Sequence, residues 1–119
     1  MLRWTGISYL KADLMRALIV ALLLFPTAAA SGFYSGNEIY NMCQGPGKHL
    51  GYIAGVWDTL IAMHELDIAP KVFCSSNDVT LGQAGDVVCR YLERHPEKRH
   101  LSASSLVGSA LLEAWPCAR

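Results

Sequence analysis

The sequence lacks a surplus of charge of either sign. Its 119 residues carry ten basic and ten acidic side chains, so the formal net charge is zero when His is neutral. Charged residues make up 17% of the chain and hydrophobic residues 52%. A nucleic-acid-binding surface requires clustered Lys and Arg, and a disordered chain requires low hydrophobicity and high net charge. The composition therefore predicts a folded domain without a nucleic-acid partner.

Motifs for catalysis and for metal binding are also missing. The residues after His64 and Glu65 are Leu66, Asp67 and Ile68, so the zinc-protease pattern His-Glu-x-x-His lacks its second His. No Gly-x-Ser-x-Gly nucleophile elbow, no phosphate-binding loop and no Cys-x-x-Cys pair occurs. We therefore expect no enzyme activity, no cofactor and no bound metal.

The alternation of apolar and polar residues that marks a half-buried strand does not occur after residue 30. Apolar residues instead recur at helical spacing. A short helix should start with Ser35 or Asn37 as its N-cap and end before Gly45 and Pro46. A longer helix should cover roughly residues 49–66.

Two further helices have clear start and stop signals. Thr80 with Gln83 forms a capping box, and Pro96 ends that helix because it biases the preceding residue away from helical angles. Ser102 can cap the last helix, which Pro116 ends. The fold class is therefore all-α, a small four-helix bundle. The stripes expected in its core are Leu81, Ala84, Val88, Tyr91 and Leu92 in one helix and Ala103, Leu106, Val107, Ala110 and Leu111 in the other.

Gly51 and Gly55 lie four residues apart in the long helix. Each costs about 1 kcal/mol relative to Ala in a helix interior, so a compensating role is expected. We favour close packing against another helix of the same core. A homodimer interface is the alternative.

The first 30 residues have the features of a secretory signal peptide. Residues 17–25 are an unbroken apolar run, preceded by Arg16 and followed by a segment that ends in three alanines. The run is shorter than the about 20 residues that span a bilayer. We expect cleavage after Ala30, with Met15 as the true initiator, and no membrane segment in the mature domain of residues 31–119.

All four cysteines, Cys43, Cys74, Cys89 and Cys117, lie after the expected cleavage site. An even number in a small exported domain favours disulfide bonds, which form in oxidising compartments. Four cysteines allow three pairings, and the spacing alone does not choose among them. A bridge from Cys74 to Cys117 would close a loop of about 43 residues and contribute about 4 kcal/mol.

Five segments occur in a fixed order after the expected cleavage site. They are SGNEIYNMC at 35–43, LGYIAGVWD at 50–58, FCSSNDVTLGQ at 73–83, VVCRYLERHPEKRH at 87–100 and SALLEAWPC at 109–117. Together they resemble the Tai/Rap family of immunity proteins, which protect bacteria from peptidoglycan amidase effectors delivered by type VI secretion. The resemblance covers the expected mature domain. It implies a small helical periplasmic protein, often dimeric, that binds a cognate amidase and blocks its active site.

The resemblance also bears on the cysteines. The family commonly has a cysteine just before the Gly-Tyr-Ile motif, where this chain has Leu50, and Cys89 appears instead. The family's pairing therefore does not transfer as a whole. We favour a bridge between Cys74 and Cys117, with Cys43 either free or paired with Cys89.

A protruding loop is a natural plug for an enzyme cleft. The candidate partner-binding residues are Glu97, Lys98, Arg99 and His100, between the last two helices, with His95 beside them. The alternative is a turn that is merely solvated. If these residues bind, charge reversal at Lys98 and Arg99 should weaken partner binding with little loss of stability.

The sequence thus predicts a periplasmic immunity protein that inhibits a peptidoglycan amidase effector. The alternative is a periplasmic helical protein with a stress-protection or chaperone-like role and no amidase partner. An amidase gene beside this one would favour the first interpretation.

Overall fold

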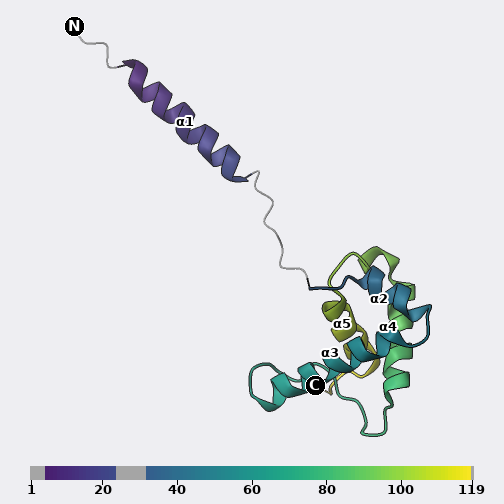
Figure 1. Ribbon diagram of the computed structural model, residues 1–119. Helices are drawn as coiled ribbons and strands as arrows, with labels where there is room; N and C mark the ends of the chain where they lie inside the picture. Colours follow the sequence, from purple (N-terminus) through teal and green to yellow (C-terminus); the bar gives the residue numbers. More distant parts are fainter. Residues whose placement is uncertain (1–4, 24–31, 119) are drawn as a thin grey trace. The chain divides into compact units, whose positions relative to one another are not determined.

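A computed structural model describes residues 5–23 and 32–118 (Figure 1). The chain divides into two units, Met1–Ala30 and Ser31–Arg119. The described part of the first unit is one helix, α1 (Thr5–Leu23), and the side chains of residues 9–20 are exposed. None of the described helices is both long and apolar enough to cross a membrane. The predicted cleavage site after Ala30 and the alternative initiator Met1 lie outside the described residues.

The second unit is built from helices. They are α2 (Gly36–Cys43), α3 (Lys48–Glu65), α4 (Leu81–Arg94) and α5 (Ala103–Ala114), with a short 3-10 helix, η1 (Pro96–Lys98), before α5. Each of the four α-helices contacts the other three. Over residues 32–118 the only strand-like pairing is an isolated antiparallel bridge between Ser35 and Ser102. The prediction of an all-α, four-helix domain is confirmed.

The helix starts follow local hydrogen bonding. The Ser35 hydroxyl accepts a hydrogen bond from the backbone N–H of Glu38, and the Glu38 carboxylate accepts one from the Ser35 N–H at 2.7 Å. Thr80 and Gln83 form the same reciprocal pair at the start of α4, as predicted. Ser102 occupies the N-cap position of α5 but makes no cap bond, because its hydroxyl lies 2.8 Å from the hydroxyl of Ser105.

The core lies between the four helices and the connector of residues 66–80. The predicted α5 stripe is buried in full, and four of the five residues predicted for α4 are buried. Leu81 is the exception, with 43% of its surface exposed, because it is the first residue of α4. The connector supplies Phe73. The buried side chains are Ile39, Ile53, Phe73, Ala84, Val88, Tyr91, Leu92, Ala103, Leu106, Val107, Ala110 and Leu111.

Two disulfide bonds join segments that are distant in the sequence. Cys43, at the end of α2, is bonded to Cys89 in α4, and Cys74 in the connector is bonded to Cys117 after α5. The backbone N–H of Cys74 also donates to the carbonyl of Trp115 at 2.8 Å. The described residues include no free cysteine.

The expected packing of Gly51 and Gly55 against another helix of the core is wrong. A Cβ atom added at either glycine would meet nothing within 4 Å, and both residues are exposed. The reason is helical geometry: Ile53, two residues from each glycine, faces the core, so both glycines lie on the opposite side of α3.

Candidate functional site

The predicted partner surface is η1 with the residues on either side of it, which we call the 95–100 turn. The structure leaves Glu97, Lys98 and His100 exposed, whereas His95 and Arg99 are half-buried. Pro96 starts η1 directly after α4 ends at Arg94, as its helix-stopping role predicts. Three of the five predicted residues are therefore available at the surface.

Arg99 has a different environment from its neighbours. Its Nε donates to the carbonyl of Leu92 at 2.6 Å, and its Nη2 donates to the carbonyl of Glu93 at 3.3 Å. The guanidinium lies over the ring of Tyr40, 3.5 Å from the ring centre. Arg99 thus satisfies carbonyl groups in the last turn of α4 and attaches that turn to α2. Because of these contacts, we now expect that reversing the charge of Arg99 would lower stability, in contrast to the little loss that the sequence predicted.

The backbone of the 95–100 turn is fixed by the start of α2. Gly36 N–H donates to the carbonyl of Leu101, and Asn37 N–H donates to the carbonyl of Arg99, both at 2.9 Å. A Cβ at Gly36 would lie 2.9 Å from both Cα and O of Arg99, so only glycine allows this approach. The backbone of the turn is therefore tied directly to the start of α2.

Two side chains of the turn, the half-buried His95 and the exposed Lys98, lie near the ring of Tyr91. The His95 ring lies 4.5 Å from the Tyr91 ring between centroids, and Lys98 Nζ lies 5.9 Å from the same ring centre. The His95 Nδ1 and Glu97 Oε1 atoms are 3.1 Å apart. The backbone N–H of Glu97, and next its contact with His95, hold the pKa of the Glu97 carboxyl below its usual range. The turn thus presents both signs of charge, a pattern suited to a polar protein surface.

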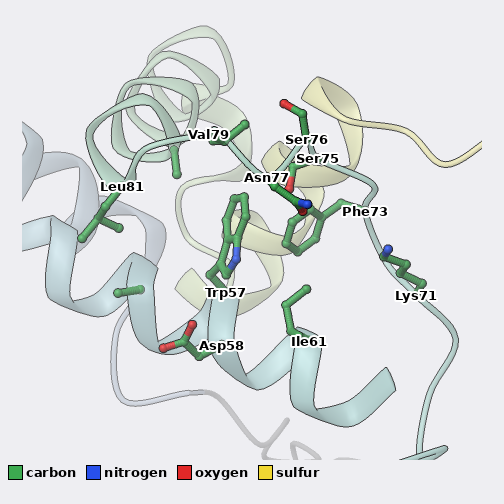
Figure 2. Close-up of a pocket in the computed structure, with 12 residues that line it drawn as sticks. Trp57, Asp58, Ile61, Lys71, Phe73, Ser75, Ser76, Asn77, Val79 and Leu81 are labelled. Atoms are coloured by element: carbon green, nitrogen blue, oxygen red, sulfur yellow. The ribbon is translucent and has the colours of Figure 1, made fainter. Parts of the chain in front are cut away.

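A cleft of about 430 Å³ lies between α3 and the connector (Figure 2). Trp57, Asp58 and Ile61 line it from α3, and Phe73 lines it from the opposite side. The Trp57 and Phe73 ring centroids are 4.4 Å apart in an edge-on arrangement. Asp58 is exposed beside this aromatic pair. No His lines the cleft, so its serine hydroxyls have no imidazole base for nucleophilic catalysis.

A second, more apolar groove of about 790 Å³ lies between α3 and α5, and we call it the α3–α5 groove. Gly51 and Gly55 line it from α3, and Gly108 lines it from α5. Because these residues have no side chains, the helix surfaces there are open. The remaining lining residues are Tyr52, Val56, Thr59, Leu60, Met63, Val72, Ser104, Ser105, Ser109 and Leu112.

The structure also brings together three residues that the sequence did not connect. Ligand atoms of Cys43, His49 and Cys89 all lie within 4.8 Å of one another. No local spacing indicated this cluster, because α2, α3 and α4 each supply one member. Both sulfur atoms are held in the disulfide bond.

Comparison with known proteins gives one match. The model of a family described as Rap1a immunity proteins matches residues 35–117. That range begins at the N-cap of α2 and ends at the last cysteine, so it contains all four helices of the second unit. A search of curated proteins and a search of solved structures each found no match.

Proposed function

This chain belongs to the Rap1a immunity protein family, and from this premise we propose that it binds and inhibits a cognate peptidoglycan amidase effector of type VI secretion. The family match over residues 35–117 is the observation that carries the proposal. An immunity protein acts by binding its effector, and this chain needs no catalytic residues for that role. The amidase is the effector class that the five segments between residues 35 and 117 together suggest by resemblance.

The proposed contact surface is the exposed part of the 95–100 turn. Glu97, Lys98 and His100 project from a backbone that is already fixed by hydrogen bonds to α2. A preorganised turn loses little conformational entropy on binding, which favours affinity. Arg99 holds this surface in place through its contacts with Leu92 and Tyr40, and in this proposal it does not contact the partner.

The proposed compartment is the periplasm. Two disulfide bonds in a domain of this size suit an oxidising environment. Peptidoglycan lies in the same compartment, so the effector would meet the immunity protein where it acts. The signal peptide expected in residues 1–30 would direct the protein to this compartment.

A homodimer is the final part of the proposal, with the α3–α5 groove as the interface. Exposed glycines let two helix backbones approach closely, and the apolar side chains beside them supply area to bury. Gly51 and Gly55 lie on this open face of α3.

A rescue experiment tests the proposal. An amidase effector encoded beside this gene would be directed to the periplasm of a test bacterium, with and without co-expression of this protein. We expect lysis to be prevented by the protein with its leader and not by residues 31–119 expressed without one. With purified components, the protein should abolish hydrolysis of peptidoglycan by the amidase.

Matched charge reversals locate the surface. Lys98→Glu should weaken amidase binding in a calorimetric titration, whereas Lys71→Glu, an identical change beside the cleft of Figure 2, should not. The opposite pattern would assign the interface to the cleft. If no amidase binds and no cell is rescued, a stress-protection or chaperone-like role replaces the immunity proposal.

A further inference from the structure

The cluster of Cys43, His49 and Cys89 is formed where three helices meet. Cys43 is the last residue of α2, His49 is the second residue of α3, and Cys89 lies in α4. Their ligand atoms all lie within 4.8 Å of one another. The disulfide that joins the two sulfurs is therefore flanked by an imidazole.

The imidazole of His49 is not satisfied by the surrounding protein. Its Nδ1 is buried and has no hydrogen-bond partner, and it is the only such side-chain atom among the described residues. A buried polar atom without a partner costs about 1–3 kcal/mol, so its presence requires an explanation. On the other side of the ring, a Cβ at Gly85 would lie 3.3 Å from Nε2, so the glycine leaves room for the imidazole against α4.

We propose that reduction of the Cys43–Cys89 disulfide by a dithiol converts this cluster into a Zn²⁺ site whose protein ligands are Cys43, His49 and Cys89. The dithiol supplies two electrons and two protons and becomes a disulfide, while Cys43 and Cys89 become thiols. Binding of Zn²⁺ then displaces one proton from each thiol to water. Two thiolates and one neutral imidazole form a ligand set that zinc accepts together with a water molecule.

The geometry allows this change without rebuilding the fold. Zn–S and Zn–N bonds of about 2.3 and 2.0 Å place the two sulfurs and the nitrogen of a tetrahedral site about 3.5–3.8 Å apart. The donors already lie within 4.8 Å, so small side-chain movements are enough once the sulfur–sulfur bond is open. Ile39 of α2 and Val88 of α4 are fully buried in the same core cluster, so apolar packing as well as the bridge links the two helices.

A cleft that opens to solvent borders the Cys43–Cys89 disulfide. A cleft of about 430 Å³ is lined by both cysteines together with Asp86, Arg90 and Glu93. It gives the dithiol and the ion a route to the site and leaves room for a water as fourth ligand. The two carboxylates favour entry of a cation, and Arg90 opposes it.

This inference does not depend on the proposed function. The expectation of no bound metal came from spacing along the chain, where the two cysteines are 46 residues apart. In the folded protein, the two cysteines are bonded to each other despite this separation in the sequence. His49 is the member that distinguishes this disulfide from Cys74–Cys117, because the latter is not part of the described cluster.

Titration of the purified protein with Co²⁺, followed by Zn²⁺, tests the proposal. After reduction with a phosphine, which does not supply a thiol ligand, we expect one Co²⁺ per chain. Its spectrum should show thiolate charge-transfer absorption and tetrahedral d–d bands, and Zn²⁺ should abolish both. The oxidised protein should give neither signal. His49→Gln should weaken binding by more than roughly the tenfold loss that outer-shell changes cause.

Matched variants separate this site from other ligands. His64→Gln, an exposed His in the same helix, should leave binding unchanged, as should the double variant Cys74→Ser/Cys117→Ser. Undiminished binding in His49→Gln, or in Cys43→Ser/Cys89→Ser, would overturn the proposal. If the reduced protein loses helical circular dichroism, Zn²⁺ must restore it in the wild type and not in His49→Gln. Failure of that restoration would also overturn it.

Discussion

Replacing Gly51 and Gly55 by alanine should stabilise this protein, although both glycines lie inside a helix. A Cβ at either position meets nothing within 4 Å, so the added methyl groups clash with no other part of the domain. Each Gly→Ala change in an exposed helix interior is worth about 1 kcal/mol, so the double variant should gain about 2 kcal/mol. For a domain of this size, that corresponds to a rise in Tm of about 10 °C.

The measurement is thermal and urea unfolding, followed by circular dichroism. The protein concentration is kept low so that monomers of the variant and of the wild type are compared. A matched control is Gly36→Ala, which should have the opposite sign. Its methyl group would lie 2.9 Å from the backbone of Arg99, which cannot move aside, and crowding of this kind costs about 1–3 kcal/mol. A loss of stability in the double variant at low concentration would refute the assignment of Gly51 and Gly55 to an open face.

The same double variant tests the proposed homodimer. Two added methyl groups on the α3–α5 groove hold a second helix farther away, so a dimer formed there should dissociate more readily. Sedimentation equilibrium measures this directly. An unchanged dissociation constant would place the interface elsewhere, and an absence of dimer in both proteins would remove the homodimer from the proposal.

Three further outcomes follow from individual contacts. Arg99→Ala should lower the free energy of unfolding by about 1–3 kcal/mol in urea denaturation because two carbonyls lose a charged donor, whereas Lys98→Glu should change it by less than about 0.5 kcal/mol. The Ser35 backbone N–H and then its hydroxyl hold the pKa of the Glu38 carboxyl below its usual 4.5. The ionised Glu38 carboxylate therefore stabilises the fold above the pKa that Glu38 has in the unfolded chain, and this contribution is lost as pH falls through its pKa in the folded protein. In Glu38→Gln, the free energy of unfolding should therefore decrease less steeply with falling pH than in the wild type. An identical pH dependence in the two proteins would contradict this. Cys74→Ser/Cys117→Ser opens a loop spanning 43 residues and should cost about 4 kcal/mol by calorimetry; a loss below about 1 kcal/mol would be inconsistent with it.

Local rules were enough to predict the helices of the second unit. The capping box of Thr80 and Gln83 and the stop at Pro96 depend on residues within a few positions of one another, and the structure contains both. The buried stripe of α5 follows from its period, because one face of an isolated helix must be covered. These signals are complete within one helix.

Features that depend on another helix could not be predicted. From the sequence, Gly51 and Gly55 could lie on a face of α3 that packs against another helix or on one that is exposed. Only the burial of Ile53 in the core shows that they lie on the exposed face. Arg99 stands in a charged run that is typical of a solvated turn, and its structural role depends on Tyr40 in α2. His49 has no partner in the nearby sequence, and its neighbours Cys43 and Cys89 come from two other helices. In each case the missing information was tertiary contact.

The pairing of Ser35 with Ser102 has a consequence for how this protein is made. The residues that open the helical domain hydrogen-bond to Arg99, Leu101 and, through Tyr34, to Ala103. A ribosome releases the earlier half of these pairs long before it has synthesised the later half. Such distant contacts form slowly. About four fifths of the domain must emerge before these contacts of α2 with residues 99–103 can form. The backbone contacts that tie the 95–100 turn to α2 are therefore among the last of the domain to form during synthesis.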